Sequence, residues 1–202
     1  MNASGHLSSS LPADLERWLG GQGDDLGRAW RECPHARWLL SLALAVELDR
    51  ALIVRAAAEL ASAALAGHAE VDPSAISALR TALAWLDGRA NASEAWACGF
   101  SASAAAAREP DPALADAIYA AAFVAFACDD KADATFYAHR GYAAKAAEAA
   151  ERVLDGAPTA ADRVRARIPV TAFLEAHAVV SHRSTTPDSG EAAVEITDSF
   201  YA

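Results

Sequence analysis

The sequence predicts an all-α protein, built as an alanine-rich antiparallel helical bundle or a short array of helical hairpins with eight to nine helices. Three observations support this prediction. Of the 202 residues, 55 are alanine, the residue with the highest helix propensity. Larger apolar side chains recur at helical spacing between acidic caps and Gly or Pro stops. No segment of the chain gives a convincing strand pattern.

The first half of the chain predicts four helices after a flexible N-terminus of residues 1–11. The first ends at Gly20-Gly21, the second is capped by Asp24-Asp25, the third opens at Pro34, and the fourth spans residues 50–66. Asp49 is the expected cap of the fourth helix. Because no Gly or Pro separates the third helix from the fourth, the two can also run together.

The middle of the chain carries the clearest helix boundaries. Asp72-Pro73 and Asp111-Pro112 each place a capping acid before a proline at the first helical position, and Asn91 with Glu94 resembles a capping box. The helix that ends at Cys128 is apolar nearly all round, which is typical of a central, buried helix. We expect Leu83 and Phe123 to lie in the core.

Two further helices are predicted at residues 131–155 and 158–180, the second bent at Pro169. One helical domain over residues 12–180 is therefore expected. Residues 181–202 form a polar linker and flexible tail whose last residues regain Ile196, Phe200 and Tyr201. This end segment is either a docking peptide that orders on a partner or a frayed terminus.

The net charge of −10 disfavours nucleic-acid binding and suits a protein partner with a basic surface. Cys33, Cys98 and Cys128 are odd in number and widely spaced, which indicates reduced thiols. The N-terminus has no signal-peptide pattern, and no apolar run is long enough to span a membrane. We therefore expect a cytoplasmic protein without membrane contact. The sequence does not fix its oligomeric state.

Acidic residues gather where helices turn. If successive helices alternate in direction, the turns at Asp87 and at Asp129-Asp130 emerge at one end of the bundle, joined by Asp49. We predict a partner-binding surface made of Asp87, Asp129, Asp130, Asp133 and His139, with Ile196, Phe200 and Tyr201 in the tail. Two alternatives stay open. In the first, the acids only cap helices. In the second, the recognised surface is the opposite end, with Glu70, Asp72, Glu109, Asp111 and Asp155.

No catalytic motif is present, so we expect no enzyme activity, no cofactor and no metal site. Cys33 and His35 lack a second ligand pair at zinc-site spacing. The acids before His139 also allow a metal or acid–base cluster, but capping explains them more simply. A small-molecule pocket that uses His139 or His177 is a further alternative.

Three segments resemble alanine-rich immunity proteins encoded beside bacterial polymorphic toxins. They are Ala84-Trp85-Leu86-Asp87-Gly88, Ala102 to Arg108, and His139-Arg140-Gly141-Tyr142-Ala143-Ala144-Lys145-Ala146. The resemblance covers about residues 81–150 and implies a helical protein that neutralises a toxin by binding it. The chain departs from that family at Ala125-Phe126, where the family usually has a Gly-His pair.

The leading functional hypothesis is thus a non-enzymatic protein-binding module, an immunity protein that covers a basic toxin site with an acidic surface. The alternative is a structural or adaptor component of a larger assembly, tethered through its C-terminal peptide.

Overall fold

A computed structural model describes residues 11–23, 25–129, 141–154 and 157–185, and every regular element in these ranges is a helix. The ten helices are α1 (Ala13–Gly20), α2 (Leu26–Glu32), α3 (Ala36–Ala45), α4 (Arg50–Leu65), α5 (Pro73–Leu86), α6 (Ala92–Ala106), α7 (Pro112–Phe126), α9 (Tyr142–Val153), α10 (Ala157–Arg167) and α11 (Val170–Thr185). The all-α prediction is confirmed. None of these helices is long and apolar enough to cross a membrane.

The predicted helix starts in the middle of the chain are confirmed. The carboxylates of Asp72 and Asp111 accept hydrogen bonds from backbone N–H groups in the first turns of α5 and α7, at 2.8 and 3.0 Å. At α6, Asn91 and Glu94 form a complete capping box, with hydrogen bonds of 2.9 and 2.8 Å in the two directions. These contacts satisfy helix N–H groups that have no partner within the helix.

The described residues alone form ten helices, more than the eight to nine predicted. Pro169 separates α10 from α11, where we expected one bent helix, because proline lacks the N–H that would continue the hydrogen-bond ladder. α3 and α4 are also separate, and Glu47 between them takes a positive φ of 53°. Of the helix expected over residues 131–155, the structure describes the part from Tyr142, where α9 begins after Gly141 with φ 53°. The expected start near residue 131 lies outside the described residues.

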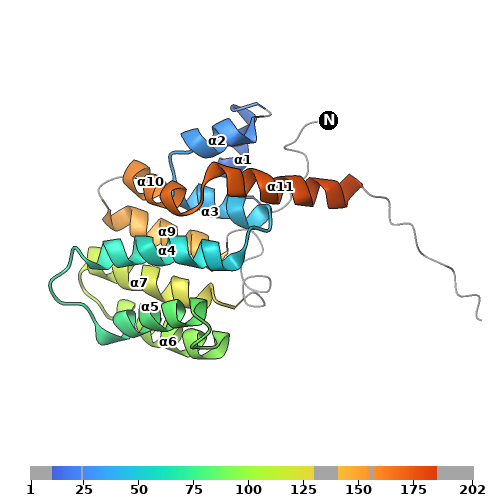
Figure 1. The fold of residues 1–202 in the computed structure, drawn as a ribbon. Coiled ribbons are helices and arrows are strands. Elements are labelled where there is room, and N and C mark those ends of the chain that lie inside the picture. Colours follow the sequence, from blue (N-terminus) through green and yellow to red (C-terminus); the bar gives the residue numbers. More distant parts are fainter. Residues whose placement is uncertain (1–10, 24, 130–140, 155–156, 186–202) are drawn as a thin grey trace, which may run out of the picture.

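Helix α7 lies at the centre of the lower part of the fold, as its apolar composition predicted. It packs against α4, α5, α6 and α9, while α3 and α10 pack on the far side of α4 and α9 (Figure 1). Eight residues of α7 are buried, five of them alanine. Small side chains let helix axes approach closely. Gly99 of α6 is an extreme case, because a Cβ there would lie 2.6 Å from the Phe126 ring.

The buried apolar side chains of all ten helices join in one cluster, from Leu11 to Phe173. Its largest fully buried pair is Trp30 of α2 and Phe173 of α11, whose rings stack with centroids 4.4 Å apart. The expectation for Leu83 was wrong, because its side chain is 42% exposed. α5 turns Ala78, Leu79 and Ala82 inward instead. Phe123 packs against the cluster but is only half-buried.

Candidate functional site

The structure describes only part of the predicted partner-binding surface. Asp87 ends α5, and Asp129 follows α7. The remaining predicted residues lie outside the described ranges: Asp130, Asp133, His139, Ile196, Phe200 and Tyr201. Their place in the surface stays a prediction.

Asp87 and Asp129 do lie toward the same end of the bundle. The guanidinium of Arg50, at the start of α4, donates a hydrogen bond of 2.9 Å to the Ala127 carbonyl, so the start of α4 adjoins the end of α7. The turn from α5 to α6 emerges on this side too (Figure 1). Arg89 forms an ion pair of 2.7 Å with Asp87, and both are exposed. Arg50 and Arg89 therefore offset part of the negative charge at this end.

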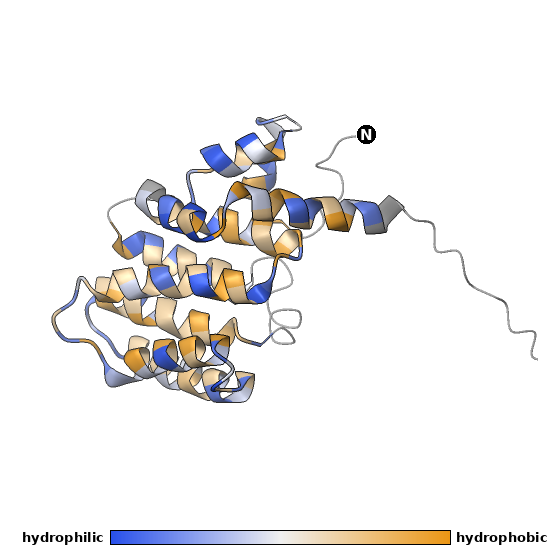
Figure 2. Cartoon of the chain, in the orientation of Figure 1, coloured by the Kyte–Doolittle hydropathy of each residue, from blue (hydrophilic) through white to orange (hydrophobic). Residues whose placement is uncertain are grey.

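Two turns at the opposite end carry a denser set of described carboxylates. They join α4 to α5 and α6 to α7, lie side by side in Figure 1, and are mostly hydrophilic in Figure 2. We call them the acidic turn pair, defined by Glu70, Asp72, Glu109 and Asp111. All but the half-buried Glu109 are exposed, and Arg108 is the only Lys or Arg in the two turns, residues 66–72 and 107–111. Among the described residues, this end is more acidic than the one that the sequence favoured.

The electrostatics of Asp72 show that the two turns are close. Hydrogen bonds from the hydroxyl and the backbone N–H of Ser74 hold the pKa of Asp72 below its ordinary value. The charge of Arg108, in the other turn, lowers that pKa further. Asp72 is therefore fully ionised at neutral pH, and its charge adds to the surface although the carboxylate also caps α5.

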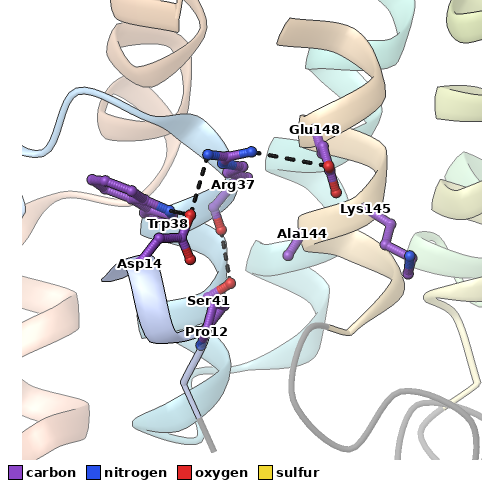
Figure 3. A pocket seen from close by; sticks show the side chains of 8 residues that line it. All are labelled: Pro12, Asp14, Arg37, Trp38, Ser41, Ala144, Lys145 and Glu148. Atoms are coloured by element: carbon purple, nitrogen blue, oxygen red, sulfur yellow. Dashed lines mark hydrogen bonds and ion pairs between the residues drawn. The ribbon is translucent and has the colours of Figure 1, made fainter. Parts of the chain in front are cut away.

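A small polar cleft lies between α1, α3 and α9 (Figure 3). Arg37 of α3 spans it: its Nη2 donates to Asp14 at 3.3 Å, and its Nη1 lies 3.9 Å from Glu148 of α9. The indole N–H of Trp38 donates to the same oxygen of Asp14 at 3.2 Å. The cleft is partly open, and its volume of about 20 Å³ has room for about one water molecule. Its hydrogen bonds and ion pairs join three helices.

About one turn beyond Glu148 on α9, Glu151 fixes the start of α3 against α9. Its carboxylate accepts a hydrogen bond of 3.1 Å from the backbone N–H of Arg37, and its second oxygen lies 3.7 Å from Nδ1 of His35. Burial raises the pKa of Glu151, while burial and the charge of Arg37 lower the pKa of His35. Sequence reasoning could not find this network, because Glu151 lies 114 residues from Arg37 in the chain.

The histidines and cysteines of the described ranges do not assemble into a reactive group. No set of three or more His, Cys, Asp or Glu side chains there could hold a metal ion. Burial raises the pKa of Cys33 and of Cys128 to about 12, so both thiols stay protonated. His177 lies 3.4 Å from the hydroxyl of Ser181 and does not line the cleft.

The described site features are therefore those of an alanine-rich helical scaffold with acidic turns at its ends. Comparison with models of protein families, with curated sequences and with solved structures finds no match to this chain. The resemblance to immunity proteins stays a prediction.

Proposed function

We propose that this chain is a non-enzymatic protein-binding module whose partner has a basic surface, and that this partner is a toxin domain that the chain neutralises. The observation that supports the proposal best is the acidic turn pair. Four carboxylates from two neighbouring turns stand at one end of the bundle with Arg108 among them. Asp72 and Asp111 are fixed by their capping hydrogen bonds, so the charges are held in place before a partner arrives.

Such an arrangement favours binding in two ways. A concentrated negative potential steers a basic partner and raises the association rate, and salt screens this effect. Carboxylates on rigid turns also lose little conformational entropy when they pair with arginine or lysine. Binding through this surface should therefore weaken as ionic strength rises.

The end with Asp87 and Asp129 is the second surface that such a partner can use. A pair of charge-reversed variants separates the two. Glu70→Lys with Glu109→Lys changes the acidic turn pair and keeps the capping carboxylates of Asp72 and Asp111, although it removes the hydrogen bond of 3.1 Å that Glu109 accepts from the Asp111 N–H. Asp87→Lys with Asp129→Lys changes the other end. Because each variant reverses two acids, their net charges are equal, and each serves as the control for the other.

The test uses co-expression with the protein encoded by the neighbouring gene. We expect the wild-type chain to retain that protein at about 50 mM salt, to release it at about 500 mM, and to protect cells from its toxicity. The variant at the acidic turn pair should lose both retention and protection, while the variant at Asp87 and Asp129 keeps them. If only the variant at Asp87 and Asp129 lost retention and protection, the binding site would lie at that end instead. No retention and no protection by the wild type would refute the proposal.

An adaptor role is the second candidate, and the position of α11 favours it. This helix extends beyond the bundle (Figure 1), with Leu174 38% and Val179 50% exposed. It leads into the C-terminal segment, which lies outside the described residues. Deletion of residues 192–202 should abolish assembly with a larger complex and leave the helical content unchanged. Assembly that survives the deletion would contradict this role.

A further inference from the structure

Helix α6 has an outer face that is unusual for a surface helix. It lies at the edge of the fold and packs chiefly against α5 and α7 (Figure 1). Surface helices normally carry charged side chains opposite the core, but Glu94 is the only charged residue in α6. Its exposed residues, followed by Arg108 just past its end, are Ser93, Glu94, Ala97, Phe100, Ser101 and Ala104.

Phe100 stands out on this face. Its side chain is 58% exposed, the most among the large apolar side chains in the described ranges. The ring is nevertheless held in place, because it makes edge contacts with Trp96 and Phe126 at centroid distances of 5.5 and 5.3 Å. An aromatic ring that is fixed and exposed is a typical anchor of a protein interface.

The outer face is complementary to itself when two α6 helices lie antiparallel. With about 100° per residue, Ala97 and Ala104 share the centre of the face, Phe100 lies on one flank, and Glu94 on the other. A two-fold axis beside residues 100 and 101 brings Ala97 of each copy opposite Ala104 of the other. The same axis brings the two Phe100 rings together.

The charges obey the same symmetry. Glu94 and Arg108 lie about seven residues, or about 10 Å, on either side of that axis. Both side chains are exposed. In the antiparallel pair, Glu94 of each copy faces Arg108 of the other, which gives two ion pairs. A parallel pair would instead place Glu94 against Glu94 and Arg108 against Arg108.

We propose that the outer face of α6 binds a second copy of this chain in an antiparallel, two-fold symmetric dimer. The alanines allow close approach of the two helices, Phe100 supplies the apolar contact, and the pairing of Glu94 with Arg108 sets direction and register. One helix pair is a small interface, so the dimer is weak and depends on concentration. The proposal does not rest on the proposed toxin binding, although the two surfaces share Arg108.

Sedimentation equilibrium of the full chain, from about 5 to about 500 µM at about 0.15 M salt, measures the association. We expect the wild type to pass from monomer to dimer across this range. Ala104→Arg should remain monomeric throughout, because the long side chain prevents close approach. The matched control is Ala166→Arg, an exposed alanine on α10, which should dimerise like the wild type. Thermal melts of both variants check that they fold.

Charge exchange tests direction and register. Arg108→Glu should weaken the dimer about threefold to thirtyfold, because two attractive contacts become repulsive. Adding Glu94→Arg to this variant should restore the wild-type affinity, since the two pairs are then attractive again. Glu94 also belongs to the capping box, so Glu94→Gln gives a second variant that keeps the cap and loses the charge.

A wild-type chain that stays monomeric at every concentration would overturn the proposal. So would a dimer that Ala104→Arg leaves intact, because association would then use another surface. A double charge exchange that binds as weakly as Arg108→Glu alone would overturn the antiparallel register.

Discussion

Replacing Gly99 by alanine tests how tightly α6 packs on α7. Helix propensity alone favours the change, since alanine in a helix interior is about 1 kcal/mol better than glycine. The space around Gly99 opposes it. The new Cβ would lie 2.6 and 2.7 Å from two ring atoms of Phe126 and 3.1 Å from the carbonyl oxygen of Ala122. The first two distances are far below normal contact, and the carbonyl belongs to a helix backbone.

The Phe126 ring has little freedom to move away. Trp96, Phe100 and Tyr142 surround it at centroid distances of 4.6, 5.3 and 5.2 Å. Overfilling a packed core typically costs about 1–3 kcal/mol, and these contacts place Gly99→Ala in the upper half of that range. After the gain in propensity is subtracted, we expect a net loss of about 1–2 kcal/mol.

Urea unfolding followed by far-UV circular dichroism measures this loss, and Tm should fall by about 2–4 °C for each kcal/mol. Gly20→Ala is the control, because Gly20 is also helical and a Cβ there meets no atom within 4 Å. That variant should be neutral or slightly more stable. If Gly99→Ala were as stable as the wild type or more so, α6 and α7 would not be packed as described.

Three other predictions follow from burial. Phe173→Ala should cost about 3–5 kcal/mol in urea unfolding, because the ring is fully buried against an indole; a loss below about 1 kcal/mol would contradict that burial. Alkylation under native conditions should modify half-buried Cys98 well before Cys33 and Cys128, whose pKa values are raised to about 12. Equal rates of alkylation for the three thiols would contradict the burial of Cys33 and Cys128. Burial lowers the pKa of His35, so the folded state binds its proton less readily than the unfolded state, and the free energy of unfolding should fall as pH drops below 6.5. His35→Gln should reduce this dependence of the free energy of unfolding on pH. An unchanged dependence would show that protonation of His35 does not destabilise the folded state.

The sequence was a good guide to helices that begin with a side-chain cap. Asp72, Asp111 and Asn91 each act within three residues of their own position, so the chain alone determines their hydrogen bonds. Pro169 was recognised too, but whether a proline bends a helix or ends it depends on the packing on both sides. The error in helix count has that cause.

Leu83 and Arg37 show what local patterns could not supply. In α5 the alanines face inward, so the hydrophobicity of a side chain did not reveal which face is buried, and Leu83 was assigned to the wrong one. Arg37 gave no signal, because it contacts Asp14, Glu148 and Glu151 only once three separate helices have docked. For the acidic surfaces, the alternating direction of the helices placed the turns at the two ends, but the contact of Arg50 with the Ala127 carbonyl, 77 residues away, exists only in the folded chain.

The first and last helices of the chain depend on each other. Arg165 donates a hydrogen bond of 2.7 Å to the carbonyl of Cys33, 132 positions earlier, and the ring of Trp30 is covered by Phe173. During synthesis the N-terminal helices therefore leave the ribosome long before the residues that bury them exist. Until translation nears its end, that indole stays open to solvent or to a chaperone, so truncated products of this gene should be substrates for proteolysis.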